Sequence, residues 1–144
     1  MIDIKVQILN NDAKIPEYKT EGSSGFDLQS METWLLAPGE IHVFGTGLAF
    51  EIPEGYEMQI RPRSGLSAKT HLRLPNAPGT IDSDYRGEVG IILENISNEP
   101  IVISKGDRVA QGVIQQVEYA KFKLVDDLSQ TERGDGGYGS TGVK

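Results

Sequence analysis

The feature that most restricts the fold of this sequence is a series of short apolar runs separated by turn-forming residues. The first run, IDIKVQIL, places Ile2, Ile4, Val6 and Ile8 on one face at a period of two, which predicts a half-buried β-strand. Further runs, most of them bounded by Pro, Gly, Asn or Asp, occupy residues 41–52, 57–62, 87–95, 101–103, 107–118 and 121–125. Strands of this length and spacing predict an all-β sandwich or barrel.

Helical signals are confined to one short segment. SGLSAKTHL, which Ser64 opens, predicts a helix of two turns at most. No repeat or internal linker divides residues 1–144, and this length suits a single domain with a core of its own. Because the last apolar run ends near Val125, we expect a β core over about residues 1–128 and a flexible, glycine-rich arm over about residues 129–144.

The charge balance and the absence of cysteine exclude several classes of function. The 14 basic and 21 acidic residues give a net charge of −7, which argues against a surface that coats nucleic acid. The sequence has no cysteine, so disulfides, thiolate zinc sites and cysteine nucleophiles are excluded. The N-terminal residues form neither a basic leader nor a long apolar run, so we expect no signal peptide, no membrane contact and a cytoplasmic location.

Three clusters between the apolar runs carry residues suited to binding phosphate. EGSSGFDL is a tight turn that leads Asp27 into a strand, and RPRSGLSAK places Arg63, Ser64 and Gly65 where the short helix begins. Unpaired backbone N–H groups at such a point can bind an anion. DRVAQG supplies a further arginine together with Gln111.

Two further clusters add a pair of carboxylates and a glycine-rich tail. NAPGTIDSDYRGE sets Asp82 and Asp84 on the same side of an extended segment, and RGDGGYGSTG surrounds an arginine, a tyrosine and two hydroxyls with five glycines. Each cluster alone has a structural interpretation, as a turn, a helix cap or a linker. Together they supply phosphate donors, a carboxylate to activate water and a ring for a base, which favours a nucleotide hydrolase.

The order and wording of the clusters resemble the five motifs of the trimeric deoxyuridine triphosphatase (dUTPase) family. They read here GSSGFDL, PRSGLSAK, NAPGTIDSDYRGE, RVAQ and RGDGGYGSTG, and they span residues 22–142. The resemblance implies a distorted jelly-roll or β-barrel subunit with at most one short helix, assembled as a homotrimer. Phe26, Ser67 and Tyr138 stand where tyrosine, alanine and phenylalanine are commoner, and they preserve shape or aromaticity.

The resemblance also implies the reaction and the residues that perform it. The family hydrolyses dUTP to dUMP and pyrophosphate, which limits uracil incorporation into DNA and supplies dUMP for dTMP synthesis. By this likeness Asp82 is the general base that orients a water for attack at the α-phosphate, and Gln111 helps to hold that water or the phosphates. Arg63, Ser64 and Gly65 bind the triphosphate.

Magnesium is the cofactor that the resemblance implies, carried by the substrate phosphates with no direct protein ligand. Asp27 then does not contact the metal itself but orders metal-bound waters or the arginine of the second motif. His42 and His71 have no partner histidines at ligand spacing, so we interpret both as surface or strand residues.

By the same likeness, the third motif reads the base and sugar, and the fifth closes the site. Asn76, the backbone that follows it and Gly90 on the return strand of a hairpin contact uracil, while Tyr85 lies against the deoxyribose and so excludes UTP. The arm becomes ordered on substrate and reaches a neighbouring subunit's site, where Tyr138 stacks over uracil and Arg133 grips the γ-phosphate. The other residues implied to bind substrate are Gly79, Thr80, Ile81, Gly139, Ser140 and Thr141.

Two rival functions stand beside this interpretation. The first is dCTP deaminase, an enzyme of the same fold, which by resemblance keeps a phosphate-binding Arg-Ser cluster. That family has Asp-Pro-Gly-Trp where this chain reads DSDY. The glutamate that performs deamination there would fall on Ile92, which cannot transfer protons. The second is a catalytically inactive relative that binds nucleotides or a protein partner for regulation. The presence of Asp82, Arg63 and Arg133 argues against this function. Arg86 and Arg108 are equally consistent with structural ion pairs and with substrate contacts.

Overall fold

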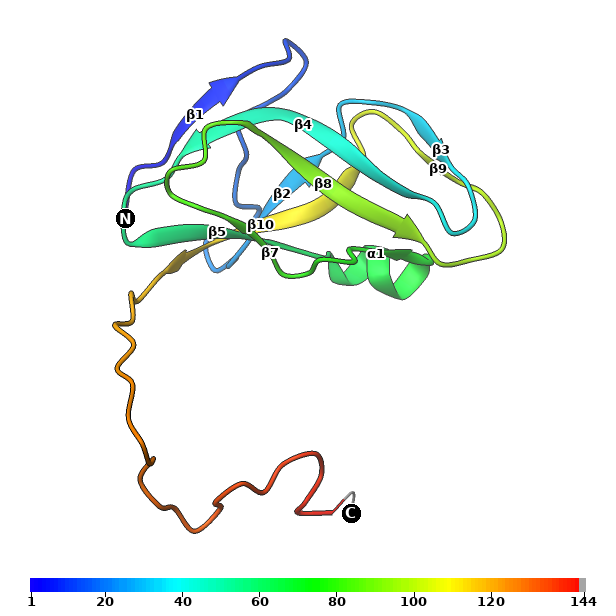
Figure 1. Cartoon of the computed structure of the whole chain (residues 1–144). Helices are drawn as coiled ribbons and strands as arrows, with labels where there is room; N and C mark the ends of the chain where they lie inside the picture. The colour runs from blue at the N-terminus through cyan, green and yellow to red at the C-terminus, as the bar shows by residue number, and fades with distance from the viewer. Residues whose placement is uncertain (143–144) are drawn as a thin grey trace.

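The computed structural model describes residues 1–142 and consists of two four-stranded sheets, one two-stranded sheet and a single helix (Figure 1). The first sheet has the strand order β1-β4-β8-β6, the second has the order β2-β10-β5-β7, and β3 pairs with β9. All the pairs are antiparallel. The elements are β1 Lys5–Ile8, β2 Phe26–Gln29, β3 Trp34–Leu36, β4 Ile41–Glu51, β5 Tyr56–Arg61, α1 Ser64–Lys69, β6 Leu72–Arg73, β7 Gly79–Ile81, β8 Glu88–Asn95, β9 Ile101–Ile103 and β10 Arg108–Gln116.

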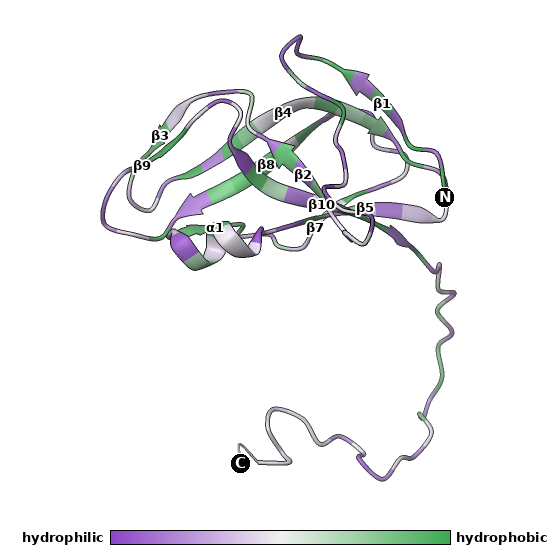
Figure 2. Cartoon of the chain, turned by 180° about the vertical axis from the view of Figure 1, so that it is seen from behind, coloured by the Kyte–Doolittle hydropathy of each residue, from purple (hydrophilic) through white to green (hydrophobic). Residues whose placement is uncertain are grey.

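The core lies between the two four-stranded sheets. Strand β8 buries alternate residues, and Val89, Ile91 and Leu93 are 0% exposed. Phe44 on β4 and Met58 on β5 are also completely buried, so both sheets contribute to one apolar cluster. Burial of each such side chain is worth about 1.5–3 kcal/mol. Figure 2 shows the hydrophobic residues concentrated on these strands. The predicted all-β fold with one short helix is confirmed.

The first predicted strand is shorter and less buried than its sequence pattern indicates. Strand β1 begins at Lys5, and both Ile2 and Ile8 are exposed. β1 is an edge strand that pairs with β4 alone, and Ile2 lines an open apolar hollow of about 470 Å³ that the rest of the described chain does not cover. Across the pair, the Lys5 ammonium donates to Glu51 at 2.7 Å and lowers the pKa of that carboxyl, first through the hydrogen bond and then through its charge.

The prediction of a last strand at residues 121–125 is wrong. Strand β10 ends at Gln116, and Val117 makes the last backbone bond to the body, donating to Gly55 O at 2.8 Å. Beyond it Phe122 and Leu124 are 93% and 98% exposed. Within residues 118–142, every hydrogen bond joins two residues of that same segment. Figure 1 shows this segment running away from the body.

A small sheet covers one end of the sandwich; it joins β9, which was predicted as the apolar run at residues 101–103, to β3, which the sequence pattern did not indicate. Strands β3 and β9 pair over three residues, and Trp34 stacks on His42 of β4 with ring centroids 4.1 Å apart. The indole N–H donates to Glu40 at 3.0 Å, and His42 Nε2 lies 2.9 Å from Glu32 Oε1. Trp34 thus packs on β4, and the place of His42 on that strand agrees with its interpretation as a strand residue.

Candidate active site

Asp27 on β2 holds two arginines together. The Arg63 Nε donates to Asp27 Oδ1 at 2.7 Å, and the Arg108 Nη1 donates to Oδ2 at 3.2 Å. Arg63 also donates to the Arg108 backbone carbonyl at 3.3 Å. Two guanidinium groups thus share one carboxylate that is 17% exposed, which leaves excess positive charge at this corner. The sequence was consistent with either an ion pair or a substrate contact for Arg108, and the ion pair is present.

Gln111 on β10 joins the first, second and fourth motifs. Its Nε2 donates to the Pro62 carbonyl at 2.9 Å. A Cβ added at Gly25 would come within 2.4 Å of the Gln111 Oε1, so a side chain at Gly25 would displace the amide. The sequence analysis did not single out Gly25, although glycine in a turn of the first motif is the signal of such a close approach.

The start of helix α1 lies beside this corner. Arg63 is the N-cap residue and makes no side-chain capping bond, because a guanidinium carries only donors and cannot accept from the helix amides; it donates to Asp27 instead. Ser64 is the first helical residue, and both Ser64 and Gly65 are exposed. The first amides of the helix therefore lack a side-chain acceptor, which leaves them free for an anionic ligand.

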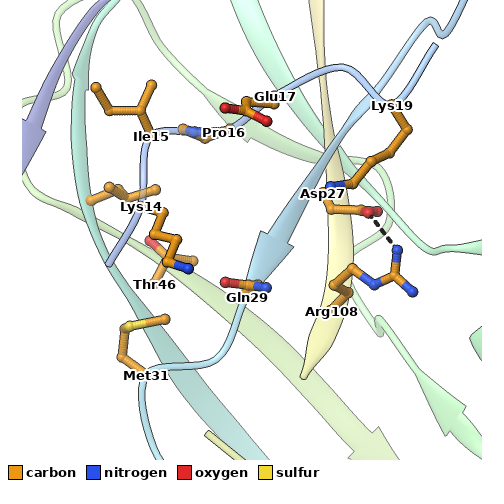
Figure 3. Close-up of a pocket in the computed structure, with 11 residues that line it drawn as sticks. Lys14, Ile15, Pro16, Glu17, Lys19, Asp27, Gln29, Met31, Thr46 and Arg108 are labelled. Atoms are coloured by element: carbon orange, nitrogen blue, oxygen red, sulfur yellow. Dashed lines mark hydrogen bonds and ion pairs between the residues drawn. The ribbon is translucent and has the colours of Figure 1, made fainter. Parts of the chain in front are cut away.

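An open cavity of about 370 Å³ lies on the other side of Asp27 and Arg108 (Figure 3). Lys14, Glu17 and Lys19, from the segment between β1 and β2, line it together with Gln29. The figure shows the ion pair of Arg108 with Asp27 at its edge. The cavity brings further cationic side chains close to the corner.

The third motif includes β7, which is an edge strand. It pairs with β5 and has no second neighbour among residues 1–142, so one row of its backbone N–H and C=O groups is free. Asn76 packs against this strand, since a Cβ at Gly79 would lie 3.1 Å from the Asn76 Nδ2. Thr80 is exposed and Ile81 is half-buried.

Asp82 lies in a tight turn rather than in the extended segment predicted for Asp82 and Asp84. The Tyr85 N–H donates to the Asp82 carbonyl at 3.2 Å, because the chain must reverse direction between β7 and β8. Arg86 donates to the carbonyls of Ser83 at 2.6 Å and Tyr85 at 3.1 Å. Its role in the structure is therefore to hold the turn, by hydrogen bonds to backbone rather than by the predicted ion pair.

The prediction of a two-stranded hairpin formed by the third motif is also wrong. β7 belongs to the sheet with β5, whereas β8 and its Gly90 belong to the sheet with β4. Gly90 pairs with Gly45, and a Cβ there would come within 2.6 Å of Val43 Cγ1. The turn at Asp82 therefore crosses from one layer of the sandwich to the other.

The structure separates Asp82 from the arginine corner within one chain. Along β7 the pairing runs from Gly79 opposite Ile60 to Ile81 opposite Met58, so the chain leads away from Arg63 as it approaches Asp82. The segment of β5 between Met58 and Arg61 alone is about 10 Å long. Asp82 lines a different hollow, of about 780 Å³, with Glu54, Glu57 and Tyr119 among its walls.

The fifth motif folds on itself, away from both hollows. Arg133 Nε donates to the Gly136 carbonyl at 2.8 Å. Tyr138 is fully exposed and has a positive φ of 51°, in the left-handed region that non-glycine residues seldom adopt. Gly139 also has a positive φ, of 82°, and Ser140 N–H donates to the Gly137 carbonyl at 3.0 Å. The arm residues thus lie apart from the other four motifs.

Neither a metal-binding cluster nor a membrane-spanning helix is present within residues 1–142. In this range no three His, Cys, Asp or Glu side chains are grouped so that they could hold a metal ion. None of the helices there is long and apolar enough to cross a bilayer.

Comparison with known proteins identifies the family. The dUTPase family model matches residues 11–142. The chain is 55% identical to the deoxyuridine 5'-triphosphate nucleotidohydrolase of Nautilia profundicola over 139 residues, which cover 96% of this chain and 98% of the relative. It is 49% identical to the enzyme of the same name from Alkaliphilus metalliredigens, over 100% of both chains.

Solved structures give the same result. A mutant dUTPase of Staphylococcus bacteriophage 80alpha, solved with dUpNHpp, matches with a TM-score of 0.91 and 34% identity, over 99% of this chain and 100% of that one. A mutant dUTPase of the S. aureus phage phi11, whose structure reveals the coordination of a structural Mg(II) ion, matches with a TM-score of 0.84 and 30% identity, over 90% of this chain and 100% of that one. The family predicted from the five motifs is thereby confirmed, and the chain belongs to the dUTPases, a family of deoxyuridine 5'-triphosphate nucleotidohydrolases.

Proposed function

We propose that this chain hydrolyses dUTP to dUMP and pyrophosphate, by attack of a water molecule on the α-phosphate. The observation that carries the proposal is the corner where Asp27 holds Arg63 and Arg108 beside the uncapped start of helix α1. Such a corner supplies charge-assisted donors and backbone amides to a polyphosphate. Because the chain belongs to the dUTPase family, the polyphosphate proposed for this corner is that of dUTP.

Asp82 is the proposed general base. A carboxylate positioned against a water can accept its proton while the oxygen attacks phosphorus. The water oxygen forms the new P–O bond, and the bond from the α-phosphorus to the bridging oxygen breaks, so pyrophosphate leaves with the electron pair. Arg63, the Ser64 hydroxyl and the Gly65 amide stabilise the charge that develops on the phosphate oxygens.

Gln111 and Asp27 position these groups. The Gln111 amide is held by the Pro62 carbonyl and is available to the water or to a phosphate oxygen. Asp27 orients Arg63 through a 2.7 Å hydrogen bond. Since a positioned guanidinium loses less freedom when substrate binds, this contact favours tight binding of the triphosphate.

Magnesium is the proposed cofactor, held by the substrate phosphates. The donor set fits this arrangement, because the nearest carboxylate, Asp27, is already shared by two arginines and is suited to contact metal-bound water rather than the metal itself. Bound Mg²⁺ would neutralise part of the phosphate charge.

The third motif is the proposed site for the base and the sugar. The free backbone row of β7, over Gly79, Thr80 and Ile81, offers donors and acceptors that suit uracil, with Asn76 beside it. Cytosine presents an amino group where uracil has a carbonyl oxygen, so buried groups would be left unpaired. The Tyr85 ring is 44% exposed, and its hydroxyl donates to Glu88 O at 2.9 Å, which fixes it for contact with the deoxyribose.

A homotrimer is the proposed active form. Asp82 and Arg63 lie at different ends of the sheet in one chain, so a complete site requires Asp82 from one copy and the arginine corner from another. A head-to-tail contact of this kind gives a ring when the rotation between neighbouring copies closes, as it does in the proposed trimer. The arm then closes a neighbouring site, with Tyr138 over uracil, Arg133 on the γ-phosphate and Gly90 behind the base pocket. The backbone of Gly139, Ser140 and Thr141 completes the phosphate contacts.

The cellular role follows from the reaction. Hydrolysis of dUTP lowers the pool available for incorporation of uracil into DNA and provides dUMP for dTMP synthesis, and we place the enzyme in the cytoplasm, where that pool is made. Its substrate partner is the free nucleotide rather than nucleic acid, in keeping with the net charge of −7.

The test is pyrophosphate release from dUTP, UTP, dCTP and dTTP, with magnesium and with a chelator. We expect turnover of dUTP alone, dependent on the metal. Asp82→Asn should lower kcat by at least about 100-fold and retain dUTP binding, because the amide keeps the shape of the base but cannot take a proton. Equal hydrolysis of UTP would contradict the role of Tyr85, ammonia release from dCTP would indicate a deaminase, and binding without turnover by the unmodified protein would indicate an inactive relative.

A further inference from the structure

Arg61 belongs to a polar row that crosses three strands beside the proposed phosphate site. On β10, Gln111 pairs with Asp27 of β2 on one side and with Arg61 of β5 on the other. Directly opposed residues in antiparallel strands present their side chains on the same face, with Cβ atoms about 4.5–5.5 Å apart. Arg61 therefore lies within reach of any group that the Gln111 side chain contacts.

The charge of Arg61 is not matched by a carboxylate within the part of the chain that the structure describes. Its Nη2 and Nε donate to the Gln59 Oε1 at 2.7 and 3.1 Å, and this acceptor is a neutral amide. The Gln59 Nε2 in turn donates to Glu57 Oε1 at 2.7 Å, so Gln59 stands between Arg61 and the Glu57 carboxylate. Arg61 is half-buried, and a half-buried cation without a direct countercharge is costly unless a ligand supplies one.

A shallow hollow, open to solvent, lies beside this guanidinium. It has a volume of about 460 Å³ and is lined by Gln59, Arg61, Pro62, Ala77, Pro78 and Gln111. Its walls come from the second and fourth motifs on one side and from the loop before β7 on the other. The hollow thus continues the proposed phosphate site toward the proposed base site.

We propose that Arg61 is a further substrate-binding residue, which supplies a third cation to the polyphosphate of the nucleotide. Three arginines, Arg61, Arg63 and Arg108, then serve one face, on which Asp27 pairs with Arg63 and Arg108 and leaves the charge of Arg61 unpaired within residues 1–142. This excess of positive charge suits a polyanion and does not suit an uncharged nucleoside. The inference rests on the proposed function, because it assigns Arg61 to the substrate of that same site.

The test compares Arg61→Gln with Arg73→Gln in the full-length chain. Arg73 lies on β6 in the other sheet, where its guanidinium donates to the Leu72 carbonyl, so its replacement removes the same charge away from the site. We expect Arg61→Gln to raise the KM for dUTP about tenfold, or about 1.4 kcal/mol, and to leave inhibition by deoxyuridine unchanged. Arg73→Gln should change neither quantity.

Rescue and folding measurements separate substrate binding from a structural role. Arg61→Lys should recover most of the KM, since the charge is retained. Arg61→Met keeps the apolar stem and replaces Arg61→Gln in the comparison if the latter folds poorly. If Arg61→Gln has the same KM for dUTP as Arg73→Gln, the proposal is overturned. It is also overturned if Arg61→Gln weakens the binding of dUTP and of deoxyuridine equally and lowers the Tm. Absence of dUTP hydrolysis by the unmodified chain would instead overturn the proposed function.

Discussion

At the scale of single residues, Asp27 is the carboxylate that holds the two arginines of the candidate site together. It accepts hydrogen bonds from two arginines on different elements, and its side chain is 17% exposed. Removal of one partner from a partly buried ion pair leaves the other charge without compensation, which costs more than the pair itself contributes. Asp27 therefore stabilises the fold and positions Arg63 at the same time.

We expect Asp27→Asn to lower the free energy of unfolding by about 1–3 kcal/mol, because two charge-assisted hydrogen bonds are weakened and two neighbouring guanidinium groups repel each other. Urea denaturation would measure the loss. Asp126→Asn is the matched control, since Asp126 is exposed in the segment after β10. Equal stability of the two variants would show that the Asp27 pairs make no net contribution to stability.

Several site residues could be predicted from the sequence and others could not. The pairing of Asp27 with the arginine of the second motif agrees with one of the two roles suggested for Asp27. The close contact of Gly25 with Gln111 and the uncompensated charge of Arg61 depend on strand register, which brings together residues up to 86 positions apart. Local sequence patterns do not specify such a register.

At the scale of elements, the long strand β4 depends on one glycine that lacks room for a side chain. Gly47 has a φ of 68°, and a Cβ there would lie 2.7 Å from the Asn10 Cβ and 3.0 Å from the Ala13 Cβ. Its N–H donates to Glu88 Oε1 at 2.7 Å, and its carbonyl accepts from Leu9 N–H at 2.8 Å. The connection after β1 thus packs directly against the backbone of β4.

Gly47→Ala should destabilise the protein by more than about 1 kcal/mol, since both the left-handed backbone and the close contacts oppose a methyl group. Gly39→Ala is the control, because Gly39 has a similar φ of 72° but nothing lies within 4 Å of its added Cβ. Thermal unfolding of both variants separates the two costs. If the two values of Tm fall equally, the contacts of Gly47 with Asn10 and Ala13 do not contribute.

Element prediction succeeded where one face of a strand is buried. On β8, every second residue is buried, as the period of two requires. It failed at residues 121–125, because an apolar run becomes a strand only when an edge is available to pair with it. It found β9 as the apolar run at residues 101–103, but it missed β3, whose three residues are too few to show a period.

At the scale of the whole molecule, the proposed site divides between copies of the chain. Asp82 lines one hollow of the subunit, whereas Arg63 lies at the corner with Asp27, so a variant of either residue would disable a different half of the proposed site. Neither half can be restored within a chain that carries the mutation. Assembly would therefore allow two inactive variants to complement each other.

Mixing Asp82→Asn with Arg63→Gln after denaturation and joint refolding should restore activity to about a quarter of the wild-type level. In a head-to-tail trimer, each mixed ring contains one site with both residues intact, and three-quarters of randomly assembled rings are mixed. Pyrophosphate release from dUTP measures the recovery, with each variant refolded alone as the control. No recovery on mixing would place both residues in a site made by one chain.

The position of β7 at the edge of its sheet has a consequence for how selectivity can change over time. Its free N–H and C=O groups belong to the main chain, which is the same in every amino acid except proline. If these groups recognise a ligand, most point substitutions at Thr80 or Ile81 leave that recognition unchanged. A change in ligand preference would then require a different backbone conformation at β7. Single mutations produce such a change far less readily than they replace a side chain.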